Sequence, residues 1–250
     1  MRKLEIITKE PFATGSTYAL AIHQLKDSKN PKLVLPTFKQ NVELLVELPE
    51  ELFKQYLSSW IDSTTGIAHK KHSTEFKIIP SSKDLRNIPK DFSKSFINCN
   101  YGSLDGITLD SKNGSYNQGL TKPDFLKHPA WNETLGSNLV KKLGNKVYAI
   151  LGEDRKIMGF YVGENTNEDQ LGSLCLRSLD NDCDAYDGFN LSSNGRFLRV
   201  AQRGAEGAKT QKILAPTKKE YLALAKGLIV GPNMSEFEKR IDALHDKYIR

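Results

Sequence analysis

The stretch from Ser173 to Ala201 constrains the fold of this chain more than any other, because two apolar segments frame a polar one. The first frame, residues 174–176, and the second, residues 197–200, are rich in residues that favour strands. Between them lie residues 177–194, here called the polar span, which consist mainly of Asp, Asn, Ser and Gly. The pattern predicts two framing strands that fold against the core and an irregular segment that faces solvent.

The composition of this stretch is unusual for a surface segment. Residues 173–201 contain no Lys, Glu, Gln, Met or Trp, although these five types make up 54 of the 250 residues of the chain. At that frequency, a gap of this length arises by chance about once in a thousand placements. Turn chemistry explains the Asp, Asn, Gly and Ser that are present, but it explains the missing Lys and Glu less well.

The overall composition is that of a soluble globular protein with a net charge of +6. Lysines are spread along the chain without a basic stripe, so we expect no nucleic-acid partner. We also expect neither membrane insertion nor a signal peptide, because no apolar run is long enough. The three cysteines, Cys99, Cys175 and Cys183, cannot all pair, which favours a reduced compartment. Without a signal peptide, the expected location is cytoplasmic or virion-associated.

The first hundred residues predict an N-terminal portion that mixes strands and helices. We expect strands at residues 4–7, 18–25 and 76–79, where residues of high β-propensity cluster. Pro49 is expected to begin a helix, because apolar residues recur on one helical face as far as Ile61. Residues 80–98 resemble a mixed loop and are the best candidate for a boundary within the chain.

Two helices are predicted C-terminal to the mixed loop at residues 80–98. Thr121 is expected to cap a short helix that ends at His128, before Pro129. A second helix is indicated by four apolar residues at a spacing of four, with Gly144 as its terminating glycine. These four residues are Trp131, Leu135, Leu139 and Leu143.

Residues 147–151 and 157–162 predict a β-hairpin, since both runs are apolar and β-prone and a polar turn joins them. After Ala201, two further helices are predicted from capping boxes that begin at Thr217 and Ser235.

This order of elements, with two helices, a hairpin, a loop and framed strands, resembles a C-type-lectin-like domain. The polar span resembles, more specifically, the variable region of proteins diversified by retroelements. In that family, mutagenesis at adenines turns Asn codons into codons that never encode Lys, Glu, Gln, Met or Trp. Two motifs are similar to archaeal and uncultured-bacterial members: Leu120-Thr121 with His128-Pro129-Ala130-Trp131, and Gly195-Arg196-Phe197-Leu198-Arg199-Val200-Ala201.

The resemblance covers about residues 119–202 and implies an α+β chain in three parts. Residues 1–95 would form an N-terminal α+β portion, and residues 96–205 the C-type-lectin-like variable ligand-binding domain. Residues 206–250 would form a C-terminal helical extension, a departure from the many members that end soon after the variable region. The implied protein is not an enzyme, needs no cofactor, and binds a variable macromolecular ligand, either a protein or a surface glycan.

The resemblance also implies which side chains face the ligand. Leu176, Leu179, Leu191 and Phe197 would be fixed apolar anchors. We expect Tyr186 to be exposed and to contribute most, because tyrosine offers a large, rigid contact area with a polar tip. The implied contacts are Arg177, Ser178, Asp180, Asn181, Asp182, Cys183, Asp184, Tyr186, Asp187, Phe189, Asn190, Ser192, Ser193 and Asn194.

A calcium site is a rival interpretation of the same residues. Asp180, Asp182 and Asp184 match the first, third and fifth positions of an EF-hand loop. However, Ala185 stands where that loop needs Gly, and Leu191 stands where it needs the bidentate Glu. The Glu-Pro-Asn and Gln-Pro-Asp motifs of sugar-binding C-type lectins are also absent from the chain.

Two other classes of function remain as alternatives. An enzyme related to the formylglycine-generating proteins of this fold would need paired cysteines, and Cys175 and Cys183 lie close in sequence. No supporting catalytic constellation surrounds them, and a strand cysteine is more often a small core residue. The other alternative is an interaction protein of a virion or surface assembly, without any variability.

Overall fold

A computed structural model describes residues 4–7, 11–27, 33–163, 166–188 and 191–202. The chain divides into two units, Met1–Ala205 and Glu206–Arg250, and every described residue belongs to the first. The helices predicted to begin at Thr217 and Ser235 therefore lie outside the described residues. Among the residues that are described, no helix combines the length and apolar character needed to cross a bilayer.

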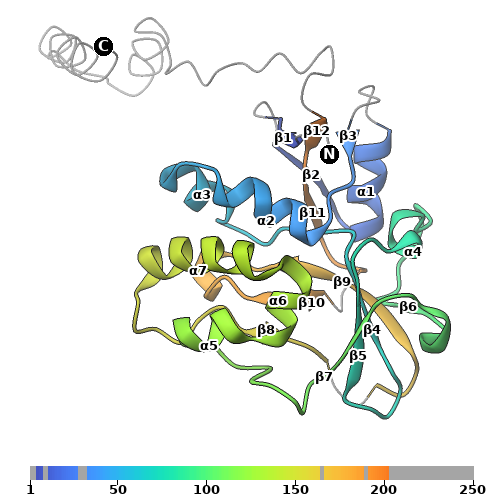
Figure 1. Cartoon of the computed structure of the whole chain (residues 1–250). Helices are drawn as coiled ribbons and strands as arrows, with labels where there is room; N and C mark the ends of the chain where they lie inside the picture. The colour runs from blue at the N-terminus through green and yellow to red at the C-terminus, as the bar shows by residue number, and fades with distance from the viewer. Residues whose placement is uncertain (1–3, 8–10, 28–32, 164–165, 189–190, 203–250) are drawn as a thin grey trace, which may run out of the picture. The chain divides into compact units, whose positions relative to one another are not determined.

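The first unit contains both helices and strands (Figure 1). The helices are α1 (Tyr18–Lys26), α2 (Phe38–Val46), α3 (Glu50–Tyr56), α4 (Lys83–Arg86), α5 (Lys122–Lys127), α6 (Pro129–Leu135) and α7 (Ser137–Leu151). The strands up to the last helix are β1 (Leu4–Ile6), β2 (Phe12–Gly15), β3 (Leu33–Val34), β4 (Gly66–His69), β5 (Glu75–Ile79), β6 (Ile97–Asn98) and β7 (Ile107–Asp110). The later strands are β8 (Phe160–Tyr161), β9 (Gln170–Leu176), β10 (Ala185–Gly188), β11 (Gly195–Leu198) and β12 (Val200–Gln202).

The largest sheet has the strand order β7-β5-β4-β9-β10-β8, and β6 also pairs with β9. Its neighbours are antiparallel, apart from the parallel pair of β10 and β8. Strands β4 and β5 come from the portion expected at residues 1–95, whereas β9 comes from the expected ligand-binding domain. Both parts of the chain therefore build the sheet that carries the first framing strand.

The second framing segment forms two strands that pair with the start of the chain. Strand β11 pairs with β2, and β12 lies between β1 and β3. An isolated bridge between Ile61 and Leu176 places the segment before β4 beside the end of β9. Both framing segments thus pair through their backbones with residues that lie more than a hundred positions earlier in the sequence.

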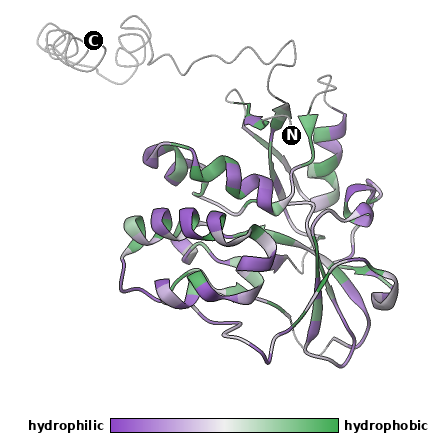
Figure 2. Cartoon of the chain, viewed as in Figure 1, coloured by the Kyte–Doolittle hydropathy of each residue, from purple (hydrophilic) through white to green (hydrophobic). Residues whose placement is uncertain are grey.

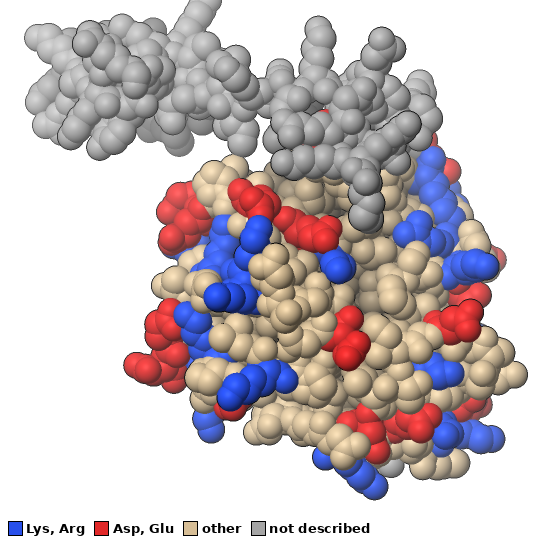
Figure 3. All heavy atoms as spheres, in the orientation of Figure 1, with Lys and Arg blue, Asp and Glu red and all other residues tan. Residues whose placement is uncertain are grey.

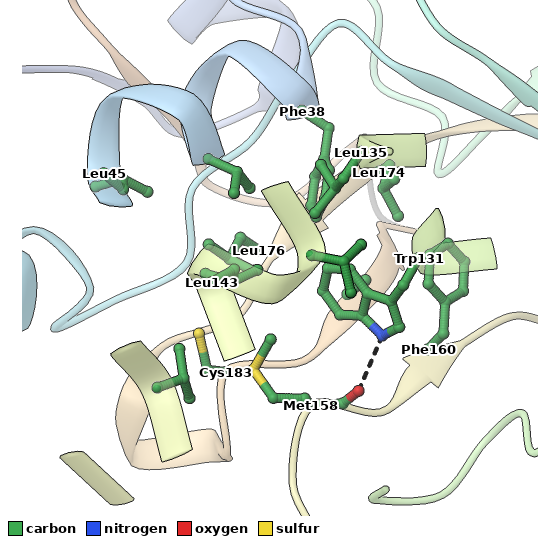
Figure 4. Packing of buried hydrophobic residues seen from close by; sticks show 14 of the residues in the cluster. Phe38, Leu45, Trp131, Leu135, Leu143, Met158, Phe160, Leu174, Leu176 and Cys183 are labelled. Atoms are coloured by element: carbon green, nitrogen blue, oxygen red, sulfur yellow. Dashed lines mark hydrogen bonds between the residues drawn. The ribbon is translucent and has the colours of Figure 1, made fainter. Parts of the chain in front are cut away.

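The main core lies between the sheet and helices α2, α5, α6 and α7, which contact one another. Trp131 is fully buried at its centre, and its indole N–H donates to the carbonyl oxygen of Met158 at 2.9 Å (Figure 4). Phe38 and Phe160 pack against this indole. Figure 2 shows both hydrophilic and hydrophobic residues along α2 and α7, as expected for helices that bury one face.

Several local predictions are confirmed. Strand β1 covers most of the run predicted at residues 4–7, and β5 matches the run predicted at residues 76–79. Helix α3 begins after Pro49, although it ends at Tyr56 and does not continue as far as Ile61. Helix α5 has its expected cap, because the Thr121 side chain accepts the backbone N–H of Asp124.

The strand predicted at residues 18–25 is wrong, because this segment is helix α1. The Thr17 side chain accepts the backbone N–H of Leu20 and caps the helix. Ala19, Ala21 and Ile22 are fully buried on one face. Alanine is the strongest helix former, so the cap and the alanines outweigh the β-prone residues between them.

The hairpin predicted at residues 147–162 is also wrong in its first half. Helix α7 continues to Leu151, and Val147 and Tyr148 are fully buried in the main core. The helix break falls at Gly136, where φ is +82°, and not at Gly144. Gly144 lies within α7, where an added Cβ would come within 2.8 Å of the Phe125 ring. This glycine therefore serves close helix packing rather than helix termination.

Candidate binding surface on the framed strands

The alternation of side chains along β9 and β10 divides the polar span into inward and outward positions. Residues directly opposite in a sheet share a face. Ala185 and Asp187 lie opposite Leu176 and Leu174, whose side chains are fully buried in the main core. Tyr186, between them, therefore points to the other face of the sheet.

The four implied anchors are buried, as expected. Leu176 and Phe197 are fully enclosed, Leu191 is 1% exposed, and Leu179 is 9% exposed. Leu191 and Phe197 belong to a second apolar cluster around helix α1. The frame is thus fixed by apolar contacts on both sides of the polar span.

The expectation that all the implied contacts face outward is wrong for four of them. The buried residues are Ser178, Cys183, Asp184 and Asp187. Phe189 and Asn190 lie outside the described residues, and so does the side chain of Asn181. The ligand-contact role of the remaining residues stays a prediction.

A tight turn accounts for the burial of Ser178 and Cys183. The backbone N–H of Cys183 donates to the carbonyl oxygen of Ser178 at 3.1 Å. Asp182 and Cys183 both have positive φ, at 68° and 58°. This backbone directs the Cys183 side chain into the core, near Leu176 and Leu143 (Figure 4).

Asp184 is buried because it satisfies a backbone group of a distant segment. Its Oδ1 accepts the backbone N–H of Gly159 at 2.7 Å, just before β8. Burial raises the pKa of Asp184 to about 6, although this hydrogen bond favours the charged form. The side chain thus positions β8 beside β10 instead of meeting a ligand.

Asp187 is buried against a histidine from β4. Its Oδ2 lies 2.8 Å from Nε2 of His69 and accepts the backbone N–H of Gly163 at 2.6 Å. The His69 ring also stacks on Phe76, with ring centroids 6.4 Å apart. Burial raises the pKa of Asp187, and the contact with His69 opposes that rise. This pair connects β10 to β4 across the intervening strand β9.

The outward part of the polar span presents a guanidinium and a tyrosine. The Arg177 guanidinium lies 5.1 Å from the centre of the Tyr186 ring, within cation–π range. Tyr186 is half-buried, and its ring centroid lies 6.3 Å from that of Tyr161 on β8. Asp182 pairs with Arg155 at 2.5 Å. Other side chains of the span that are at least partly exposed are Asp180, Ser192, Ser193 and Asn194.

Three residues of this surface, Trp60, Asp62 and Tyr161, lie outside the polar span and carry no sequence signal that indicates a site. The Ile61–Leu176 bridge places Trp60 beside Arg177 and Asp62 beside Cys175. Trp60 is 38% exposed, and it is the one large hydrophobic side chain classed as exposed among the described residues. The polar span and its neighbours therefore share one face of the sheet.

Asp62 is a buried carboxylate close to Trp60. It accepts the backbone N–H of Arg196 at 2.7 Å. Burial raises the pKa of Asp62 to about 7, although Arg196 and the Trp60 side chain favour the charged form.

The raised pKa of Asp62 predicts that the free energy of unfolding depends on pH. An unfolded aspartate has a pKa of about 4, so between about pH 4 and about pH 7 only the folded state keeps the proton. The free energy of unfolding should therefore fall as pH rises through this window, by up to about 4 kcal/mol. Asp184 and Asp187 titrate in the same direction, so the variant Asp62→Asn isolates the contribution of Asp62.

The measurement is chemical denaturation of both proteins at about pH 5 and about pH 8. We expect the fall between the two pH values to be smaller in Asp62→Asn than in the wild type. The Trp60 emission of the wild type should also change near neutral pH, and this change should vanish in the variant. An equal fall in both proteins would show that Asp62 is not the titrating group.

The geometry does not favour the calcium interpretation. Asp184 is buried and accepts the Gly159 N–H, whereas Asp182 pairs with Arg155, so these two aspartates of the EF-hand-like spacing have different partners. Across the described ranges, no group of three or more His, Cys, Asp or Glu side chains could hold a metal ion.

The cysteines also lack the setting of reactive thiols. Cys175 and Cys183 are buried and not bonded to each other, and burial raises the pKa of both thiols. Thiols in such surroundings stay protonated and are poor nucleophiles.

Figure 3 shows Lys and Arg residues interspersed with Asp and Glu on the visible face, without one sign prevailing.

No protein-family model and no curated protein sequence matches the chain. Among solved structures, the fold matches one that concerns the accommodation of massive sequence variation in Nanoarchaeota by the C-type lectin fold. The TM-score is 0.61 at 11% sequence identity, and the match covers 80% of this chain and 98% of the other. At this identity the likeness establishes the architecture alone. The chain therefore has a C-type lectin fold.

Proposed function

We propose that this chain is a ligand-binding protein whose polar span is a variable region, diversified by a retroelement and displayed on a C-type lectin fold. The observation that carries the proposal is the coincidence of two properties in one segment. The segment lacks the five residue types that mutagenesis of Asn codons cannot produce, and its strands separate inward from outward side chains. Sequence variation in the similar nanoarchaeal structure supports the proposal.

The division of the polar span narrows the set of variable contacts. Inward residues hold the frame through distant partners, so substitution there would disturb the fold. Outward residues can change with little cost, since exposed substitutions usually alter stability by less than about 0.5 kcal/mol. The contacts that fit this requirement are Arg177, Asp180, Asp182, Tyr186, Ser192, Ser193 and Asn194.

The DNA around the coding sequence tests this proposal. We expect a near-copy of codons 173–201 close to a reverse-transcriptase gene. The copy should differ from the coding sequence mainly where the copy has adenine, and mainly at codons for outward residues. The codons for Cys183, Asp184 and Asp187 should agree in both sequences. Intact flanking DNA with no such copy would contradict diversification.

A second candidate is an interaction protein whose surface does not vary. The observation in its favour is that Trp60 and Tyr161, which lie outside the polar span, share the candidate face. This candidate keeps the binding role and removes only the variability, so the same DNA comparison separates the two.

A further inference from the structure

Four residues from four adjacent segments lie in a row on the outward face of the sheet. Ile61 and Leu176 exchange both backbone hydrogen bonds, at 2.8 and 3.0 Å, so the flanking residues Trp60 and Arg177 form a closely spaced pair. Arg177 leans over the ring of Tyr186 on β10, and Tyr186 lies opposite Tyr161 on β8. We call these residues the aromatic row: Trp60, Arg177, Tyr186 and Tyr161.

The composition of the aromatic row is that of a binding hot spot. Trp, Tyr and Arg dominate the energetics of protein interfaces, because they combine large contact area with a polar or charged tip. A single exposed apolar residue needs no explanation. Trp60, however, lies next to the other three residues of the aromatic row.

Arg177 gives the aromatic row a positive charge. Arg177 has no carboxylate within ion-pair distance in the part of the chain that the structure describes. The neighbouring Asp182 is already paired with Arg155. Burial raises the pKa of Asp62 to about 7, so at neutral pH this residue carries less negative charge than an ordinary aspartate. A planar guanidinium between aromatic rings favours a carboxylate as its partner.

We propose that the aromatic row is a docking surface for an acidic protein segment, in which a carboxylate pairs with Arg177 while apolar groups pack on Trp60 and Tyr161. This proposal deepens the proposed function and rests on its binding role. Trp60 and Tyr161 lie outside the polar span, so they supply a constant part of the contact while the residues of the span vary.

A displayed library of random peptides, panned on the immobilised full chain, tests this proposal. We expect the enriched peptides to contain Asp or Glu together with apolar residues. A synthetic copy of one enriched peptide should bind the wild type and change the Trp60 emission, since the other tryptophan, Trp131, is fully buried. Its affinity should fall about tenfold or more in Trp60→Ala and in Tyr161→Ala, as for hot-spot residues.

Matched charge variants separate specific pairing from general attraction. Arg177→Gln and Lys141→Gln each remove one positive charge, and Lys141 is exposed on α7, which covers the opposite face of the sheet. Only Arg177→Gln should weaken peptide binding by about tenfold. Trp60→Phe should keep most of the affinity, and circular dichroism should confirm that each variant is folded.

Three outcomes would overturn the docking proposal. The first is enrichment of peptides without acidic residues, or no enrichment at all. The second is equal binding by the wild type and Trp60→Ala. The third is binding of neutral glycans from a glycan array that depends on the same residues. The DNA comparison tests variability independently, so a missing near-copy would leave the docking result intact.

Discussion

Replacing Trp131 with alanine is expected to lower the free energy of unfolding by about 3–5 kcal/mol. The indole is fully buried, and Phe38, Phe125 and Phe160 pack against it. Its removal would leave a large cavity and an unpaired carbonyl at Met158. The Met158 N–H in turn donates to the carbonyl oxygen of Asp182 at 3.1 Å, so the loss would extend to the polar span.

The other tryptophan of the chain is the matched control. Trp60→Ala removes the same side chain from a position that is 38% exposed. We expect a loss of about 1 kcal/mol, because this side chain is partly exposed and leaves no enclosed cavity. Denaturant titration followed by far-ultraviolet circular dichroism measures both variants. Equal losses at the two positions would contradict the assignment of Trp131 to the frame and Trp60 to the surface.

Sequence alone predicts those parts of this fold that depend on local chemistry. The Thr121 cap, the start of α3 after Pro49 and the strand β5 all follow from residues within one turn or one strand. The sequence of helix α1 fits both a strand and a helix pattern, and tertiary packing and the Thr17 cap decide in favour of the helix. The end of α7 does not follow from local pattern, because apolar, β-prone residues also suit a helix face that is buried in the core.

The candidate site was predicted only in part, because burial of a polar side chain depends on distant partners. Polar residues are mostly exposed, so each Asp in the polar span was expected to face outward. Asp187 instead meets His69, and Asp184 meets the Gly159 N–H, and neither partner is visible from local spacing. Trp60 reaches the surface through a bridge to β9, which sequence periodicity does not reveal.

The central claim is that the polar span consists of inward residues that hold the frame and outward residues that can change. Two neighbours on β10 provide the sharpest comparison. Asp187→Ala would leave His69 and the Gly163 N–H without their buried carboxylate, at an expected cost of about 3–5 kcal/mol. Tyr186→Ala removes a larger side chain from the outward face, with an expected cost of about 1 kcal/mol or less.

The most direct test is the free energy of unfolding of these two variants, measured side by side in denaturant. The account predicts that Asp187→Ala is destabilised by at least about 2 kcal/mol more than Tyr186→Ala. Equal losses, or a greater loss for Tyr186→Ala, would contradict the division of the polar span into a fixed frame and a changeable surface.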